Sequence, residues 1–201
     1  MTDKIKKKIG LFGGTFDPIH TGHLIIIELI RDILKLDQII FIPAKKHPLK
    51  NNNTISPEKD RFKMIQLAIE GNSSFSLSNV ELCIDKISYT IDTINIFREK
   101  LSPLENVIYF LMGMDNVNQI YKWKNPEFLV KTCQIVAFGR PGFEISEKAK
   151  PYIKDIEIIQ IPLLEISSSD IRNRVRSNQT IRYLVPAKVE EYINAKNLYK
   201  N

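Results

Sequence analysis

Two histidines with glycines beside them are the residues of this sequence best suited to chemistry. They lie in the run GGTFDPIHTGH, residues 13–23, which we call the glycine-histidine segment, and His20 and His23 are three positions apart. At the start of a helix this spacing places both imidazoles on one side, where free backbone N–H groups add positive potential. Gly13 and Gly14 let a phosphate approach the backbone closely. The segment therefore predicts a phosphate-binding turn.

A capping role and a zinc site both account less well for the two histidines. A lone loop histidine is more often a polar capping residue, but for a pair beside glycines Leu or Ala would be the more stabilising choice. A zinc site would need more ligands, and the third histidine, His47, has no metal-ligand spacing to the pair. Cys83 and Cys133 form no CxxC pair and are expected to be buried apolar residues, so no protein-bound metal is predicted. Because a loop imidazole has little packing to lose, His23→Ala is expected to lower turnover far more than stability.

A second candidate anion site lies near the C-terminus. Three serines, residues 167–169, lead into a helical pattern, so that a hydroxyl and several free backbone N–H groups converge on one point. Arg172 can add a bidentate fork, whereas Arg176 is expected to be solvated. Taken alone, this segment fits an ordinary N-cap on a basic surface helix equally well. Beside the glycine-histidine segment, the anion-binding interpretation is favoured.

A parallel sheet is the framework that can position both sites. Short apolar runs predict strands at residues 9–12, 38–43, 75–84, 107–112, 134–138 and 156–162. Helical patterns occupy residues 24–36 after a Thr21 N-cap, 57–71 after a Ser56 N-cap, 89–101, 126–133 and 146–153, followed by a helical C-terminal segment. This alternation predicts an α/β fold, a doubly wound, mostly parallel Rossmann-like sheet with helices on both faces. Ligands bind such sheets beyond the carboxyl ends of the strands, where the strand order reverses.

Composition limits the class of protein. The 201 residues, 43% hydrophobic and 26% charged, predict one globular domain, residues 1–201. No apolar run reaches the roughly 18 residues that span a bilayer, and no signal-peptide core follows the charged N-terminus, which favours a cytoplasmic protein without membrane contact. The net charge of +6 suits an anionic partner without identifying it. Since RNA-recognition aromatics, finger spacing and an uninterrupted basic stripe are all missing from the sequence, nucleic acid is not a predicted partner.

The chain resembles a known family. Its glycine-histidine segment is similar to the signature of the HxGH nucleotidyltransferases, and the GGTFDP wording resembles the bacterial nicotinate mononucleotide adenylyltransferases. Further similarity lies in the second-strand loop, the SYT and GxD motifs, a ring-stacking tryptophan and two C-terminal motifs: residues 43–50, 88–90, 113–115, Trp123, 166–172 and 182–186. The resemblance implies transfer of an adenylyl group from ATP to nicotinate mononucleotide. The products would be pyrophosphate and nicotinate adenine dinucleotide, in a step of NAD biosynthesis.

The resemblance also implies a role for each matching residue. The catalytic group would comprise His20 and His23 facing the ATP phosphates, Arg172 holding the departing phosphates, and Lys50 on a phosphate of either substrate. ATP would be bound by phosphate and ribose contacts from Gly13, Gly14, Thr15, Phe16, Gly113, Asp115, Ser168 and Ser169. The acceptor would meet Thr90, Trp123 and Arg140, with the tryptophan stacked on the pyridine ring. Mg²⁺ would arrive on ATP, since it prefers phosphate oxygens and water to a protein cage.

Departures from the family pattern leave alternatives open. Leu49 stands where a phosphate-contacting histidine is usual, and whether His47 replaces it is open. Lys124 stands where an aromatic residue is frequent, and Trp123 fits a half-buried core position as well as a stacking platform. The preference between nicotinate and nicotinamide and the oligomeric state are not set by the sequence. The alternative functions are another HxGH adenylyltransferase, with nicotinamide mononucleotide or phosphopantetheine as acceptor, and a non-catalytic nucleotide or nucleic-acid binding module.

Overall fold

One six-stranded sheet forms the centre of the protein, which a computed structural model describes at residues 6–45, 55–84, 88–139, 142–162 and 164–200. The strand order is β3-β2-β1-β4-β5-β6, and every neighbouring pair is parallel. The strands are β1 (Lys7–Gly14), β2 (Gln38–Pro43), β3 (Phe75–Leu77), β4 (Asn106–Gly113), β5 (Gln134–Gly139) and β6 (Ile156–Gln160). The order reverses between β1 and β4, which confirms the predicted doubly wound, Rossmann-like sheet.

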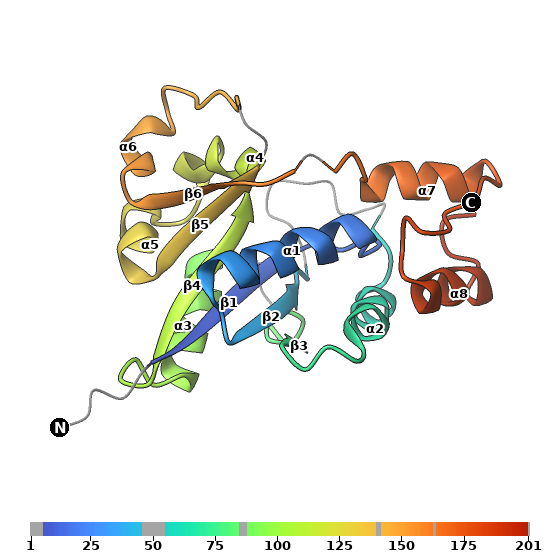
Figure 1. Ribbon diagram of the computed structural model, residues 1–201, viewed down its shortest axis with the longest axis horizontal. Coiled ribbons are helices and arrows are strands. Elements are labelled where there is room, and N and C mark those ends of the chain that lie inside the picture. Colours follow the sequence, from blue (N-terminus) through green and yellow to red (C-terminus); the bar gives the residue numbers. More distant parts are fainter. Residues whose placement is uncertain (1–5, 46–54, 85–87, 140–141, 163, 201) are drawn as a thin grey trace.

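Helices cover both faces of this sheet (Figure 1). One core cluster contains side chains of α1 (Thr21–Leu34), α2 (Glu58–Ile69), α7 (Ser168–Arg176) and α8 (Ala187–Ala195). The other contains side chains of α3 (Thr90–Lys100), α4 (Met114–Val117), η2 (Ile120–Lys122) and α5 (Pro126–Thr132), with α6 (Lys150–Ile153) packed against it. Strand β1 serves both clusters, because alternate side chains of a strand point to opposite faces: Phe12 joins the first, and Ile9 and Leu11 join the second.

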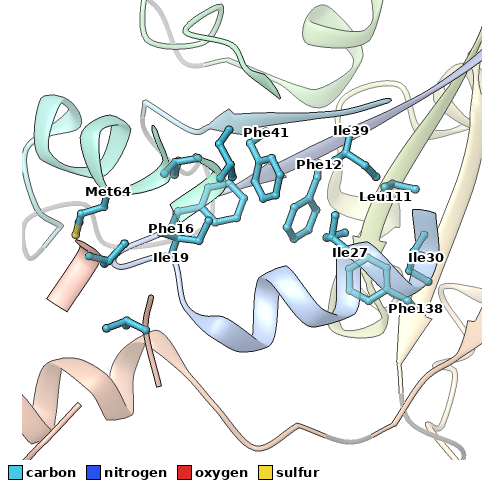
Figure 2. Close-up of a cluster of buried hydrophobic side chains, with 14 of the residues drawn as sticks. Phe12, Phe16, Ile19, Ile27, Ile30, Ile39, Phe41, Met64, Leu111 and Phe138 are labelled. Atoms are coloured by element: carbon cyan, nitrogen blue, oxygen red, sulfur yellow. The ribbon is translucent and has the colours of Figure 1, made fainter. Parts of the chain in front are cut away.

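Aromatic side chains of β1, β2 and the glycine-histidine segment lie together in the first cluster (Figure 2). The ring of Phe12 meets those of Phe16 and Phe41 edge to face, with centroids 5.3 and 5.6 Å apart. Such pairs contribute about 0.5–1.5 kcal/mol beyond their area burial. The turn after β1 is therefore tied to the core through Phe16.

Several predicted boundaries are wrong. The strand expected at residues 75–84 ends at Leu77, because Ser78 and Asn79 begin a turn in which the Ser78 hydroxyl accepts from the Val80 N–H. Cys83, expected to be buried, lies in that turn, where its N–H donates to the Asn79 carbonyl, and is exposed. The helix expected at residues 146–153 is regular only from Lys150. Within the described ranges, no helix is both long and apolar enough to cross a membrane.

Two N-cap predictions are also wrong by one residue. His20, not Thr21, is the N-cap of α1, and Pro57, not Ser56, is the N-cap of α2. Thr21 is already helical, and its N–H and hydroxyl instead bond the carbonyls of Leu184 and Tyr183. The start of α1 is thus attached to the C-terminal part of the chain, which no local pattern in the sequence could indicate.

Candidate active site

The turn after β1 is built around the buried ring of Phe16. This residue is 3% exposed and has a left-handed backbone with φ of 49°, a conformation that a bulky residue adopts only when its surroundings impose it. A Cβ at Gly14 would lie 2.8 Å from the Phe16 ring, so only glycine fits there. Since the Phe16 side chain belongs to the core, this residue can offer a ligand only its backbone, as the resemblance implies.

His20 and His23 form a reciprocal pair at the first turn of α1. The His23 N–H donates to His20 Nδ1 at 3.3 Å, and the His20 N–H donates to His23 Nδ1 at 3.2 Å. The two rings stack with centroids 3.6 Å apart and an interplanar angle of 23°. This arrangement is a capping box made of histidines, which satisfies two backbone donors of the helix start.

The capping box fixes the chemical form of both imidazoles. An Nδ1 atom that accepts a hydrogen bond carries no proton, so the neutral ring carries its proton on Nε2. Burial lowers the pKa of His20 to about 4. Burial, and then the neighbouring His20, hold the pKa of His23 well below its usual value of 6.5. At neutral pH the pair therefore offers two uncharged Nε2–H donors, an arrangement suited to hydrogen bonding with phosphate oxygens.

The pair also contributes to stability, so the expectation that a capping role accounts less well for these histidines is wrong: both are capping residues. His20 is 6% exposed, and the ring of His23 meets the Phe16 ring edge to face at 5.3 Å. The expectation that His23 has little packing to lose is therefore wrong. Gly22 leaves room for the His20 ring, because a Cβ at this position would lie 3.1 Å from His20 Nδ1.

The start of α7 meets the glycine-histidine segment. Ser167 is the N-cap, and its hydroxyl accepts from the Asp170 N–H at 3.0 Å. The Ser168 hydroxyl donates to the Pro18 carbonyl at 2.9 Å. Arg172 donates through one terminal nitrogen to the Asp17 carbonyl at 2.7 Å and through the other to the Ser169 hydroxyl at 3.1 Å. The two candidate anion sites, about 150 residues apart in the sequence, are thus adjacent in the fold.

A pocket beside Gly13 and Gly14, which we call the Thr90 pocket, brings together two of the predicted acceptor residues, Thr90 and Trp123. Its lining includes Thr90 and Trp123, together with the partly exposed Lys124. Helix α3 begins at Thr90 without a side-chain cap, so backbone N–H groups of its first turn remain available to an anion. Trp123 is half-buried and meets Phe110 edge to face at 6.0 Å. It is therefore both a core aromatic and part of the pocket wall.

A buried hydrogen-bond chain supports this pocket and was not expected from the sequence. The Thr93 hydroxyl donates to Glu81 Oε1 at 2.7 Å, and the hydroxyls of Ser88 and Thr93 are 3.2 Å apart. Burial raises the pKa of Glu81, while the bond from Thr93 acts in the opposite direction. Glu81 was hidden in the sequence because it lies where the third strand was predicted to continue.

A second pocket, the Asp115 pocket, lies at the end of β4 on the other side of the site. It is lined by Gly113 and Asp115 and by apolar residues such as Ile26, Phe138 and Phe143. Asp115 is exposed at the start of α4, and Gly113 is the N-cap of this helix. An apolar wall with one carboxylate at its mouth suits a base and its ribose. Lys50, Arg140, His47 and Leu49 lie outside the described residues.

Comparisons with known proteins agree with this geometry. A family model described as cytidylyltransferase-like matches residues 11–174. A relative from Thermoanaerobacter sp. is 40% identical over 200 residues, which cover 96% of this chain and 94% of that protein. A relative from Moorella thermoacetica is 38% identical over 200 residues, which cover 96% and 92%. Both are described as probable nicotinate-nucleotide adenylyltransferases. The chain belongs to this family.

Solved adenylyltransferase structures share the fold of this chain. The Plasmodium falciparum nicotinic acid mononucleotide adenylyltransferase complexed with NaAD has a TM-score of 0.79 at 25% identity, covering 96% of this chain and 97% of that chain. A structure of that protein complexed with APC has a TM-score of 0.77 at 23% identity over 96% and 97% of the two chains, and shows the shared fold. The predicted enzyme class, a nicotinate mononucleotide adenylyltransferase of NAD biosynthesis, is confirmed at the level of the family.

Proposed function

We propose that this adenylyltransferase joins ATP and nicotinate mononucleotide at the carboxyl ends of β1 and β4. A phosphate oxygen of the mononucleotide attacks the α-phosphorus of ATP. The bond from that phosphorus to the oxygen bridging to the β-phosphate then breaks, and pyrophosphate leaves with the electron pair. The attacking group already carries negative charge, so the protein has to orient the substrates and stabilise charge rather than supply a nucleophile.

One observation carries this proposal: the neutral histidine pair, the start of α7 and Arg172 converge on the glycine-histidine segment. In the proposed roles, the Nε2–H groups of His20 and His23 donate to the phosphate oxygens that gain charge. Backbone N–H groups of Gly14, Thr15 and Phe16 hold phosphate, beside Gly13. Ser168, Ser169 and Arg172 hold the β- and γ-phosphates as they leave.

The two pockets take the two ends of the product. We assign the adenosine to the Asp115 pocket, where Gly113 and Asp115 meet the ribose. We assign the mononucleotide to the Thr90 pocket, where the ring of Trp123 stacks on the pyridine and the first turn of α3 faces its carboxylate. Lys50 and Arg140 are proposed to contact phosphate and acceptor, from parts of the chain that the structure leaves undescribed.

Magnesium is proposed to enter with ATP. The groups that converge on the phosphate site are imidazole, guanidinium and backbone N–H donors, which fit phosphate oxygens rather than a metal ion. Mg²⁺ prefers phosphate oxygens and water, so it fits this site as part of the substrate. We further propose that residues 1–201 act as one nucleotidyltransferase domain, since one sheet supports both pockets, and that the enzyme works in the cytoplasm, where ATP is available.

Pyrophosphate release from ATP tests the proposal with a panel of acceptors: nicotinate mononucleotide, nicotinamide mononucleotide, phosphopantetheine and none. The expected result is magnesium-dependent release that is fastest with nicotinate mononucleotide, with nicotinate adenine dinucleotide identified by mass. Release with phosphopantetheine alone would assign the other HxGH activity. No release with any acceptor, combined with measurable ATP binding, would favour a non-catalytic binding module.

A further inference from the structure

A buried aspartate links the glycine-histidine segment to the end of the chain. Asp17 is 3% exposed, and its carboxylate accepts from the Tyr199 hydroxyl at 2.7 Å and from the Ser56 N–H at 3.2 Å. Its backbone carbonyl accepts from Arg172 at 2.7 Å. Asp17 therefore connects the turn after β1 to the residues that lead into α2, to α7 and to the C-terminal tail.

A buried arginine makes a hydrogen bond to the backbone of the same turn. Arg61 on α2 is 1% exposed, and it donates to the Thr15 carbonyl at 2.7 Å and to the Ser56 carbonyl at 3.1 Å. Hydrogen bonds from charged donors are worth more than neutral ones. The turn is thus restrained by Arg61 through the Thr15 carbonyl and by Asp17 through the groups that reach its carboxylate and carbonyl.

The tail reaches Asp17 because it folds back after α8. Helix α8 lies against α2 (Figure 1). After α8 the Leu198 N–H returns to the Ile193 carbonyl at 3.0 Å, and Leu198 and Tyr199 pack on the first core cluster. Tyr199 has a left-handed backbone with φ of 66°, which costs free energy for a residue with a side chain. A tail that adopts this conformation and aims its hydroxyl at Asp17 is tightly defined.

We propose that Tyr199 is a positioning residue for the ATP phosphates, acting through Asp17. The Tyr199 hydroxyl fixes the position of the Asp17 carboxylate. The backbone carbonyl of Asp17 in turn orients the guanidinium of Arg172 beside the Ser169 hydroxyl. Tyr199 makes no proposed contact with a substrate. The inference rests on the proposed role of Arg172 and the glycine-histidine segment in holding ATP.

The chain offers a matched control. Tyr192, in the same C-terminal region, donates its hydroxyl to Asp60 Oδ1 at 2.8 Å, and Asp60 is also buried, at 7% exposure. Tyr192→Phe and Tyr199→Phe each remove one tyrosine-to-aspartate hydrogen bond on the α2 side of the fold. Asp60, unlike Asp17, lies on α2 and outside the glycine-histidine segment. A purely structural tail therefore predicts the same behaviour of the two variants.

The test compares both variants by steady-state kinetics and by hydrogen exchange of the unliganded proteins. For Tyr199→Phe we expect kcat/KM for ATP to fall about tenfold, the size expected when a hydrogen bond to a charged group is lost, with KM for nicotinate mononucleotide unchanged. Amides of residues 14–17 should exchange faster in this variant. Tyr192→Phe should leave both readouts at the wild-type value, and the melting temperature of each variant is measured alongside.

Two results would overturn the inference: wild-type kinetics and exchange in Tyr199→Phe, or equal losses in both variants. The exchange readout needs no turnover, so it decides the inference independently of the activity. If the wild-type protein released no pyrophosphate with any acceptor, the proposed function would fail, while faster exchange confined to Tyr199→Phe would still support the link from the tail to the turn.

Discussion

The phosphate side of the site and the Thr90 pocket are held by different kinds of contact. On the phosphate side, the supporting groups are buried: Asp17 is 3% exposed and Arg61 is 1% exposed, and their partners come from distant parts of the sequence. The Thr90 pocket also has a buried support, the Thr93–Glu81 hydrogen bond, but its charged groups are exposed. The side chains of the Lys124–Asp92 ion pair are 44% and 41% exposed, with the Lys124 ammonium 5.0 Å from the centroid of the Tyr89 ring.

This difference separates the step that every adenylyl transfer shares from the choice of acceptor. Buried hydrogen bonds between distant elements are costly to disturb, so they define one geometry for the triphosphate. Exposed charges are screened by solvent and salt, so a change there alters affinity by small increments. We therefore expect substitutions on the phosphate side to have large effects on turnover, and substitutions at the Thr90 pocket to have graded effects on acceptor binding.

The largest effect is expected at His23. Both His23→Ala and His23→Gln should lower kcat by about 10²–10³, the usual cost of removing one donor to a charge that develops in the transition state. Glutamine is a preferred residue at this capping-box position, so His23→Gln should keep the capping bond and lose only the ring contacts with Phe16 and His20. His23→Ala should be less stable than His23→Gln by about 1 kcal/mol because the capping bond is lost as well.

The His23 pair of variants also separates chemistry from folding. Kinetics at saturating substrates and thermal unfolding of each variant provide the measurement. A His23→Gln enzyme with wild-type turnover would show that the Nε2–H group is not needed. The phosphate side would then differ from the Thr90 pocket in stability alone.

A smaller effect is expected at Arg172, which bridges Asp17 and Ser169 through two different nitrogens. Lysine retains the charge, but its single ammonium cannot replace the planar guanidinium that bonds the Asp17 carbonyl and the Ser169 hydroxyl together. Arg172→Lys should therefore lower kcat/KM for ATP by roughly thirtyfold, equivalent to about 2 kcal/mol. Arg176→Ala is the matched control, because this exposed residue bonds only Asn173 within the described part of the chain. Equal kinetics for the two variants would remove Arg172 from the phosphate site.

Acid sensitivity gives a third effect, which acts on stability rather than on turnover. The pKa of His20 is lowered from 6.5 to about 4 by burial, so the unfolded chain binds the proton first as pH falls. Stability contributed by the neutral ring is complete above pH 6.5 and declines between there and about pH 4, by about 1.4 kcal/mol per pH unit. Asparagine is also a good N-cap, so His20→Asn should fold and show a shallower pH slope. Urea unfolding across this range measures the pH slope of stability for the wild type and for His20→Asn. Identical slopes would mean that the native protein protonates His20 as readily as the unfolded chain does.

The sequence was sufficient for those features that local patterns specify. Apolar runs and helix signals predicted the parallel sheet, and the glycine and serine motifs predicted two anion sites, which the family resemblance assigned to the same ATP phosphates and which are adjacent in the fold. A serine cap was among the expectations for residues 167–169, because serine is a preferred N-cap, and the structure places it at Ser167. The third strand was overextended because the alternation continues after Leu77, although the chain turns away from β2 at Ser78 and Asn79.

Long-range polar contacts could not be predicted. Nothing around Tyr199 shows that its hydroxyl meets Asp17, 182 positions away. Arg61 looks like a surface residue of an amphipathic helix, yet it is 1% exposed under the turn. The histidine capping box was missed because histidine is an unusual residue at both of its positions. Such contacts depend on the packing of distant elements, which periodicity and spacing do not describe.

The smallest effect is expected at Lys124, and it tests the other half of the comparison. Its ammonium lies 3.0 Å from the Asp92 carboxylate and is partly exposed, so its attraction for the acceptor is largely compensated and screened. Lys124→Ala should raise KM for nicotinate mononucleotide about twofold and leave KM for ATP unchanged, as is usual for exposed pairs. Raising the salt concentration should reduce the difference from the wild type, because exposed charges are screened within about 10 Å at 0.1 M.

Asp92→Asn is the matched control, since it frees the ammonium and should lower KM for nicotinate mononucleotide, but not for nicotinamide mononucleotide. If Lys124→Ala instead abolished binding of the acceptor, the ammonium would be a main determinant of recognition. The Thr90 pocket would then be as sharply defined as the phosphate side.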